Sequence, residues 1–266
     1  MVYFILIANH EYHKESEIST DFDEANDGTI CMANRDFVKG EQFTIYYGKR
    51  SNADLLVHNG FVYTCDSGQE GKPRDVSYPH DSMVLKIGIA RTDPLAQAKY
   101  DILNQLSIPV SGGHFVLNRD EKPFDNVLLA FLRVLNMTTK EEIAKWESGV
   151  TEDKSTNEEK EKEETNEIED EKANNFADKV RELLNDNLSE HPELDTKVYK
   201  YLETRCTLLL RSYASSLEDD FKQLNIDEST ANEKVPSNLN VKHCILLRSQ
   251  EKQILNHVID YCRKNM

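Results

Sequence analysis

The chain has 266 residues, a formal net charge of −16 and 30% charged residues. This length exceeds that of a typical single domain, so we expect two domains that each bury a hydrophobic core. The negative charge would repel a phosphate backbone, which argues against direct binding of nucleic acid. No segment of the sequence is apolar for long enough to cross a bilayer, so we expect no membrane partner.

The first residues of the chain are predicted to form a series of short strands. Met1 to Ala8, Thr29 to Ala33 and Gln42 to Tyr47 are apolar or rich in β-branched and aromatic residues. Asn26-Asp27-Gly28 and Lys39-Gly40 separate them with residues that accept turn geometry. The pattern therefore predicts a meander of short strands.

A short helix is predicted after these strands. Ser51 or Asn52 can cap it, Ala53 to His58 fills it, and Gly60 lies where a left-handed C-terminal residue costs least. The stretch that follows, Cys65 to His80, is rich in Gly, Pro and Asp, and it is typical of a loop between domains.

The second half is predicted to contain one strand and then helices. Met83 to Ile89 alternates like a strand, and apolar residues recur at helical spacing from Leu95 to Leu106. Further helices are predicted over Asn126 to Leu135, Thr138 to Trp146, Phe176 to Leu188, Leu194 to Phe221, and Val241 to Cys262. One apolar face, typical of a helix-bundle core, carries Leu194, Val198, Tyr201, Leu202, Cys206, Leu209, Leu210 and Tyr213.

An acidic insertion at about 150–173 interrupts these helices. From Thr151 to Glu171 there are eleven Asp and Glu against three Lys, a net charge of −8 that is half of the total. With almost no apolar residues, this segment cannot offset the entropy cost of ordering, and we expect it to be disordered. A charged interaction segment is the alternative.

Several familiar active-site signatures are missing. The sequence has no phosphate-binding loop, dinucleotide fingerprint, serine-hydrolase elbow or zinc-protease motif. His10 and His13 lie beside Glu11 and Glu15, but no third spaced ligand accompanies them, so we predict no metal site. The cysteines are scattered without a C-x-x-C pair, as is typical of reduced thiols in the cytoplasm or nucleus: Cys31, Cys65, Cys206, Cys244 and Cys262.

The segment Phe43 to Phe61, F-T-I-Y-Y-G-K-R-S-N-A-D-L-L-V-H-N-G-F, carries a family resemblance. It resembles the closing segment of the SET domain in the group of Rubisco lysine methyltransferases and actin-histidine methyltransferases. Asn9-His10 stands where that group has its Asn-His pair. Asp36 to Gln42, D-F-V-K-G-E-Q, is similar to the stretch that precedes the tyrosine strand in that group.

The second half resembles the same group through other stretches, namely Leu85 to Leu95, Leu106 to Pro109, Leu128 to Met137 and Leu247 to Leu255. The resemblance implies an α+β fold. Residues 1–64 would be the C-terminal part of a β-rich SET domain, and 65–82 a linker. Residues 83–266 would form an all-α Rubisco-methyltransferase-type substrate-binding domain, interrupted by the acidic insertion.

The resemblance implies methyl transfer from S-adenosyl-L-methionine to a side-chain nitrogen of a protein, with no metal. Tyr47 is the implied catalytic residue, and its hydroxyl would orient the donor or the acceptor. On an ideal strand Tyr46 and Tyr47 point to opposite faces, so both could not enter one site. Arg50 is the implied substrate-binding residue. The implied donor-binding residues are Asn9, His10, Asn59, Gly60 and Phe61.

Taken without the resemblance, these residues also fit plainer roles. A tyrosine in a strand is more often a packed aromatic with a hydrogen-bonded tip. Asn9-His10 would be a turn after a buried strand, Asn59-Gly60-Phe61 a helix C-cap with a core phenylalanine, and Arg50 a surface arginine.

The implied substrate is a histidine of actin, because the helical half looks closest to the actin-histidine methyltransferases. A lysine acceptor is the alternative.

The SET domain of this group has a glycine-containing donor-binding segment before its Asn-His pair, which eight residues cannot hold, so we expect an N-terminally truncated chain. An inactive protein-binding module is therefore a second hypothesis, and an all-α scaffold a third. We expect a cytoplasmic monomer that can also reach the nucleus.

Overall fold

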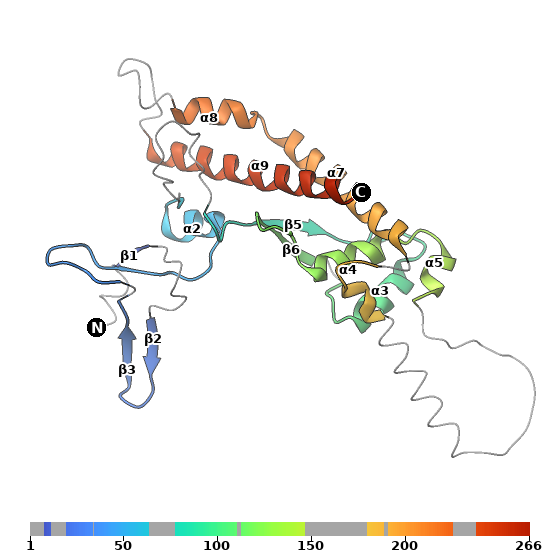
Figure 1. The fold of residues 1–266 in the computed structure, drawn as a ribbon, viewed down its shortest axis with the longest axis horizontal. Coiled ribbons are helices and arrows are strands. Elements are labelled where there is room, and N and C mark those ends of the chain that lie inside the picture. Colours follow the sequence, from blue (N-terminus) through green and yellow to red (C-terminus); the bar gives the residue numbers. More distant parts are fainter. Residues whose placement is uncertain are drawn as a thin grey trace, which may run out of the picture.

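The computed structural model describes residues 8–11, 20–33, 35–63, 78–110, 113–146, 180–188, 191–225 and 238–266. Residues 8–63, called here the N-terminal part, hold short strands and one helix. Residues 78–266, the helical part, hold the longer helices. In Figure 1 the two parts meet where helix α2 lies beside the long C-terminal helix α9.

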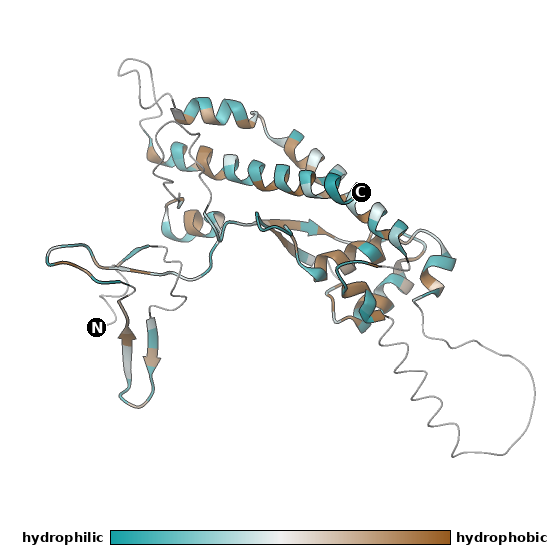
Figure 2. Cartoon of the chain, in the orientation of Figure 1, coloured by the Kyte–Doolittle hydropathy of each residue, from teal (hydrophilic) through white to brown (hydrophobic). Residues whose placement is uncertain are grey.

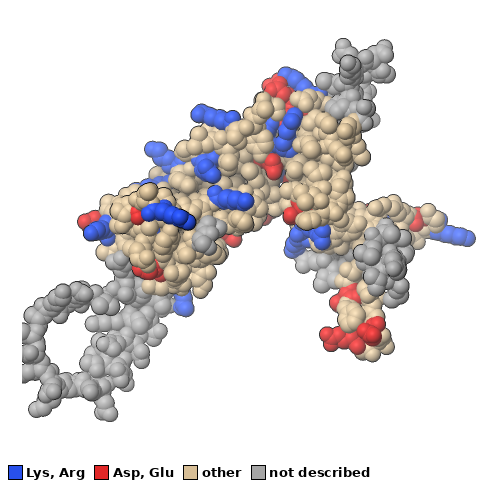
Figure 3. Space-filling model, turned by 180° about the vertical axis from the view of Figure 1, so that it is seen from behind, with Lys and Arg blue, Asp and Glu red and all other residues tan. Residues whose placement is uncertain are grey.

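The N-terminal part contains two small sheets. Strand β1 (Asn9–His10) pairs in parallel with β4 (Thr44–Ile45), and β2 (Thr20–Asp23) pairs antiparallel with β3 (Gly28–Cys31). The turn between β2 and β3 contains Asp27 with φ of 46°, so the predicted turn is confirmed. The tip of this hairpin is acidic, as Figure 3 shows from behind. The prediction for residues 1–7 lies outside the described residues.

Helix α2 (Asn52–Asn59) follows the local signals of the sequence. Ser51 caps it, because its hydroxyl accepts from the backbone N–H of Asp54 and the Asp54 carboxylate binds back to Ser51. Gly60 ends it with φ of 79° and donates its N–H to the carbonyl of Leu56. The predicted helix and both of its ends are confirmed.

The helical part begins with an antiparallel pair, β5 (Met83–Ile87) and β6 (Gly113–Leu117). Strand β5 is the predicted one, and β6 has no counterpart among the predictions. The other elements are α3 (Ala96–Gln105), α4 (Asn126–Leu135), α5 (Lys140–Ala144), the 3-10 turn η1 (Glu182–Leu184), α7 (Pro192–Ser212), α8 (Leu217–Asn225) and α9 (Leu239–Asn265).

One hydrophobic core fills the helical part. Helix α4 lies at its centre, and Figure 2 shows this helix as strongly apolar. The predicted apolar face of α7 joins the core, with Leu194, Val198, Leu202 and Cys206 buried. Lys99 is also buried, and its Nζ lies 2.7 Å from Asp93 Oδ2 and 2.9 Å from the carbonyl of Leu135. The bond from Lys99 to the Leu135 carbonyl joins α3 to the end of α4.

Two predicted helices are shorter than expected. The prediction over Leu194 to Phe221 was wrong in its middle, because α7 ends at Ser212 and α8 starts at Leu217. Ser216 exchanges hydrogen bonds with Asp219 and so starts a new helix. The stretch Phe176 to Leu188 is described only from residue 180, and its helical backbone ends after the single turn η1.

The predicted α+β class is confirmed, with small sheets and a largely helical second part. The boundary over 65–82 and the acidic insertion at about 150–173 lie largely outside the described residues, so both stay predictions. Among the helices that the structure describes, none has the length and apolar character that a bilayer crossing requires. Lys and Arg side chains are spread over the helical part in Figure 3 rather than gathered in one patch.

Candidate functional site

The parallel pair of β1 and β4 brings together the two sequence motifs of the predicted site. Asn9 lies opposite Thr44 and His10 opposite Ile45, and the backbone N–H of Glu11 donates to the carbonyl of Ile45 at 3.1 Å. This register places the Asn-His pair beside the residues that follow β4.

The imidazole of His10 lies among aromatic rings from several segments. Its centroid is 5.2 Å from that of Tyr47, 5.6 Å from Tyr46 and 6.1 Å from Phe61, with the last pair stacked. Tyr63 lies 5.2 Å away and Tyr78 6.4 Å away, both edge-on. The predicted residues His10, Tyr47 and Phe61 therefore form one cluster.

We assign the neutral tautomer of His10 from one hydrogen bond of its ring. The Nδ1 atom accepts from the backbone N–H of Tyr47 at 3.2 Å, so the ring proton of the neutral form is on Nε2. Nε2 is buried and has no hydrogen-bond partner among the described residues. A buried donor without an acceptor is costly, so this atom is a candidate contact for a bound ligand.

Burial lowers the pKa of His10, and nearby charges contribute. Desolvation is the largest cause, and the positive field of Arg50 and the neighbouring His80 lower the pKa further. The backbone of Ile45 and the carboxylate of Glu11 act in the opposite direction. The net shift is downward, which keeps the imidazole neutral at physiological pH.

The two tyrosines after β4 do not follow ideal strand alternation. β4 ends at Ile45, and Gly48 has φ of 89°, so the backbone leaves the strand before Tyr46 and Tyr47. Both rings consequently lie against His10, so the two side chains do not separate to opposite faces as on an ideal strand. Their tips differ: the Tyr47 hydroxyl donates to the Ala8 carbonyl at 2.6 Å, while the Tyr46 side chain is buried.

The end of α2 carries the remaining predicted residues. Arg50 donates from Nη1 to Oδ1 of Asn59 at 3.4 Å. This bond brings the predicted substrate-binding residue against a residue predicted to bind the methyl donor. A Cβ built on Gly60 would meet no atom of the described residues within 4 Å, so these residues leave the space beside this glycine open. Asn9 is exposed and does not share the His10 cluster through a side-chain contact among the described residues.

The motif from Asp36 to Gln42 holds the loop that leads into β4. Arg35 is central, since its Nη1 lies 2.6 Å from Glu41 Oε1 and its Nη2 3.4 Å from Glu11 Oε2. The other oxygen of Glu41 accepts from the backbone N–H of Val38 at 3.0 Å. In the described structure this motif positions the strand.

The residues that sequence reasoning missed come from distant parts of the chain. Tyr63 and Tyr78 complete the rings around His10, and Asn52 binds the backbone of Tyr63. Tyr63 has no motif around it, and only its place two residues after Phe61 could have drawn attention to it. His13 lies outside the described residues, and those residues contain no group of three side chains suited to a metal.

The chain is similar to known proteins in sequence and in fold. Residues 90–255 match the family described as Rubisco LSMT substrate-binding, and the chain belongs to that family. The fold is similar to a crystal structure of the SET domain of LSMT bound to lysine and AdoHcy, with a TM-score of 0.63 and 16% identity over 97% of this chain and 48% of that one. A structure of Rubisco LSMT bound to AdoMet gives a TM-score of 0.61 at 17% identity, with the same coverage.

Curated relatives carry a more particular name. The chain is 31% identical over 247 residues to the actin-histidine N-methyltransferase of Danio rerio, covering 93% of this chain and 34% of that protein. It is 30% identical over 253 residues to the protein of the same name from Xenopus tropicalis, covering 95% and 36%. The chain thus spans about a third of the length of the curated relatives that it matches.

Proposed function

We propose that the protein is an S-adenosyl-L-methionine-dependent protein N-methyltransferase that methylates a histidine of actin. The observation that carries this proposal is the likeness, over more than nine-tenths of the chain, to proteins named actin-histidine N-methyltransferase. The clustering of His10, Tyr47 and Phe61 supports the part of the proposal that concerns the methyl donor.

The residues of the cluster fit a methyl donor of this kind. An adenine-containing molecule offers a flat ring and hydrogen-bond acceptors, and the cluster offers aromatic faces and the buried Nε2–H of His10. The open space beside Gly60 would admit close approach of the ligand to the backbone. We expect Asn9, His10, Asn59, Gly60 and Phe61 to hold the donor.

The donor supplies an electrophilic methyl group on a sulfonium, so the protein has only to align the reactants. Alignment of this kind is worth about 7 to 11 kcal/mol of barrier. Tyr47 would contribute through its hydroxyl, which is fixed by the Ala8 carbonyl and still has a lone pair to offer. An imidazole acceptor is often neutral near pH 7, whereas a lysine has to lose a proton first.

A lysine acceptor is the alternative within the same reaction class. It is favoured by the similarity in fold to LSMT, whose structures are described as bound to lysine and to monomethyllysine. A second alternative is a protein-binding module without activity. It is favoured by the contrast between the single large core of the helical part and the small sheets of the N-terminal part.

Calorimetry and mass spectrometry test the proposal with the chain itself. Titration with S-adenosyl-L-methionine should give micromolar binding, and absence of heat would favour the binding module. Actin incubated with the chain and the donor should gain a methyl group on a histidine. A methyl group on lysine would shift the assignment to the alternative, and the Danio rerio relative serves as the reference reaction.

The matched variants Tyr47→Phe and Tyr46→Phe test the catalytic assignment. Both remove one hydroxyl from a ring against His10, but only the Tyr47 hydroxyl is held by the Ala8 carbonyl. We expect Tyr47→Phe to lower the rate of methyl transfer by about a hundredfold, because misplacing a reacting group costs about that much. Tyr46→Phe should cost far less, and equal effects would contradict the assignment.

We infer further that the protein works as a monomer in the cytoplasm and can also reach the nucleus, with actin as its partner. The four described cysteines, Cys31, Cys206, Cys244 and Cys262, are free thiols, which supports a reducing compartment. The acidic net charge supports a protein rather than a nucleic acid as substrate. Sedimentation of the purified chain and fluorescence imaging of a tagged copy would test these two inferences.

A further inference from the structure

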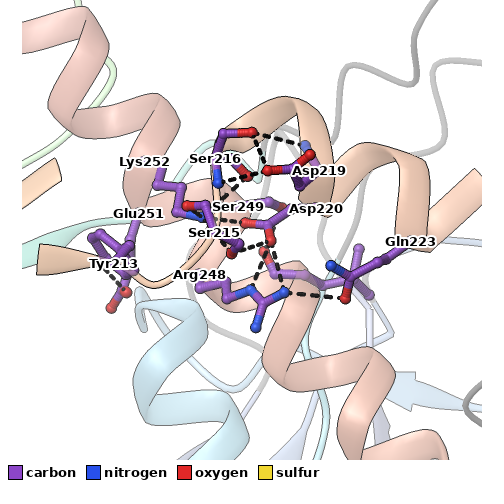
Figure 4. A network of polar contacts seen from close by, with 11 residues as sticks. Tyr213, Ser215, Ser216, Asp219, Asp220, Gln223, Arg248, Ser249, Glu251 and Lys252 are labelled. Carbon is purple, nitrogen blue, oxygen red and sulfur yellow. Dashed lines mark hydrogen bonds and ion pairs between the residues drawn. The ribbon is translucent and has the colours of Figure 1, made fainter. Parts of the chain in front are cut away.

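One turn of α9, from Arg248 to Lys252, touches both parts of the molecule. On one side it holds the break between α7 and α8, as Figure 4 shows. The Lys252 ammonium, 2% exposed, lies 2.5 Å from Asp220 Oδ2 and 2.7 Å from the carbonyl of Ser215. Arg248 binds the other oxygen of Asp220 at 2.7 Å. Buried charges therefore fix this turn of α9 against the break between α7 and α8.

The negative charge of Asp220 is compensated by the positive charges of Lys252 and Arg248. Burial alone would raise its pKa, but hydrogen bonds from Lys252, Arg248 and Ser215 outweigh burial and lower it. A buried carboxylate with so many donors stays ionised, and removing any one of them would leave a costly charge. The anchor thus fixes the position of this turn of α9.

On its other side the same turn binds α2 through Gln250. The Oε1 atom of Gln250 accepts from Nδ2 of Asn52 at 2.8 Å, and both side chains are fully buried. These residues are 198 positions apart in the sequence. The backbone N–H of Asn52 also donates to Oδ1 of Asp81 at 3.0 Å, so the start of α2 is held at both its backbone and its side chain.

Asn52 in turn fixes the backbone of Tyr63. Its Oδ1 accepts from the Tyr63 N–H at 2.7 Å, and its Nδ2 donates to the Tyr63 carbonyl at 3.1 Å. An amide nitrogen has two hydrogens, so Nδ2 is fully satisfied only when Gln250 accepts the second one. The ring of Tyr63 lies 5.2 Å from that of His10. Gln250 also donates from Nε2 to the same Tyr63 carbonyl at 3.4 Å, so α9 reaches the predicted methyl-donor site directly as well as through Asn52.

We propose that Gln250 is a positioning residue for the methyl-donor site, acting on the segment from Phe61 to Tyr63 mainly through Asn52 and also through its own bond to the Tyr63 carbonyl. This inference rests on the proposed function, since it assigns Gln250 a role in donor affinity. Without the Gln250 acceptor, the buried Asn52 amide would keep one donor unsatisfied or turn away from Tyr63. Turning away releases the chain that carries Phe61 and leaves the His10 cluster open on one side, whereas an unsatisfied donor destabilises the Asn52 contacts that hold this chain.

The first test compares Gln250→Met with Gln253→Met in the full chain. Methionine has nearly the length of glutamine but no amide, so it removes the hydrogen bond with little change in volume. Gln253 is on the same helix and accepts from Arg119 at 2.8 Å, away from α2. Calorimetry with S-adenosyl-L-methionine should show about tenfold weaker binding for Gln250→Met. Gln253→Met should change the affinity less than twofold.

Hydrogen exchange tests the same proposal without any donor. In Gln250→Met the amides of α2 and of Tyr63 should exchange about tenfold faster, while those of α4 keep their protection. Gln253→Met should leave all of them unchanged. Faster exchange together with no donor binding by the unmodified chain would support the positioning role and place the failure in the proposed function.

Three results would overturn the proposal. Wild-type exchange at Tyr63 in Gln250→Met is the first. Unchanged donor affinity despite faster exchange is the second. Equal loss of protection in α2 and α4 is the third, because Gln250 would then support the whole fold rather than the donor segment. The double variant Asn52→Leu with Gln250→Met should bind the donor only slightly more weakly than Asn52→Leu alone, since the long bond of 3.4 Å from Gln250 to the Tyr63 carbonyl is all that remains to be lost.

Discussion

The two parts of the molecule are held together by different means. The helical part encloses one continuous core, made by α3, α4, α7, α9 and the pair β5–β6. The N-terminal part relies on two-stranded sheets, two of whose strands have only two residues. It leaves large apolar side chains in contact with solvent, such as Phe22 at 57% and Val38 at 74% exposure. Burial of apolar side chains stabilises the helical part. Hydrogen bonds to the helical part help to order the N-terminal part.

This difference shows which contacts fix the positions of the residues in the predicted site. The His10 cluster lies in the part with few buried side chains, yet its segments are joined by specific polar contacts. A further contact, between Asn52 and Gln250, joins these segments to the helical part. A well-packed part therefore serves as the support on which a sparsely packed site is arranged.

Arg133→Met would test the helical side of the comparison and should have the largest effect. Arg133 is fully buried, binds Asp195 at 2.6 and 2.9 Å, and donates to the carbonyl of Leu183 at 2.7 Å. Removing it leaves the Asp195 charge unpaired, so unfolding in urea should become easier by about 3 to 5 kcal/mol. The double variant with Asp195→Leu should recover part of this loss, and a cost below about 1 kcal/mol would contradict the comparison.

Gly60→Ala would test the N-terminal side and should cost about 1 to 2 kcal/mol, because φ of 79° is unfavourable for any residue with a Cβ. No atom of the described part of the chain lies within 4 Å of the new methyl group, so we attribute the loss to the backbone. The amides of α2 should exchange faster. Gly40→Ala, with φ of 90° and equally open space, is the matched control and should leave α2 unchanged. Similar effects of both on α2 would show that it is not held locally.

Acid should weaken the helical part slightly through Glu142. We rank this effect smallest because the Glu142 and Lys197 side chains are 26% and 39% exposed, so solvent screens the pair. Burial would raise the pKa of Glu142, but bonds from Lys197 and the backbone of Thr138 and Thr139 lower it from 4.5 to about 2. A depressed folded pKa stabilises the fold above pH 4.5, and this contribution is lost as the pH falls from 4.5 toward 2. The difference in urea midpoint between wild type and Glu142→Gln should therefore shrink over that interval. A constant difference would argue against the shift.

Local signals in the sequence predicted the helices well. Ser51 and Gly60 give both ends of α2, and Asp125 as a side-chain cap agrees with the predicted start of α4. The break between α7 and α8 carried a similar signal, Ser216 followed three residues later by Asp219, but the strong apolar stripe concealed it. Strand β6 was missed because nothing in the sequence specifies its pairing partner, β5.

The candidate site could be predicted only in part. The motif around Tyr47 and the pair Asn9-His10 gave two segments of it, but not the register that places His10 opposite Ile45. The alternation rule failed for Tyr46 because the strand ends one residue earlier. The contact between Asn52 and Gln250 had no signal at all, since it depends on how two remote helices pack.

The rates at which the two buried lysines react with a reagent would report how often the folded state opens. Lys99 and Lys252 are 3% and 2% exposed, while the other described lysines are at least partly open to solvent. An acylating reagent would consequently modify the surface amines first and reach these two only when the surrounding helices separate. Lys99 joins α3 to α4, and Lys252 joins α9 to the break between α7 and α8, so their labelling rates report the opening of two different helix contacts. A single mass-spectrometric time course would follow both.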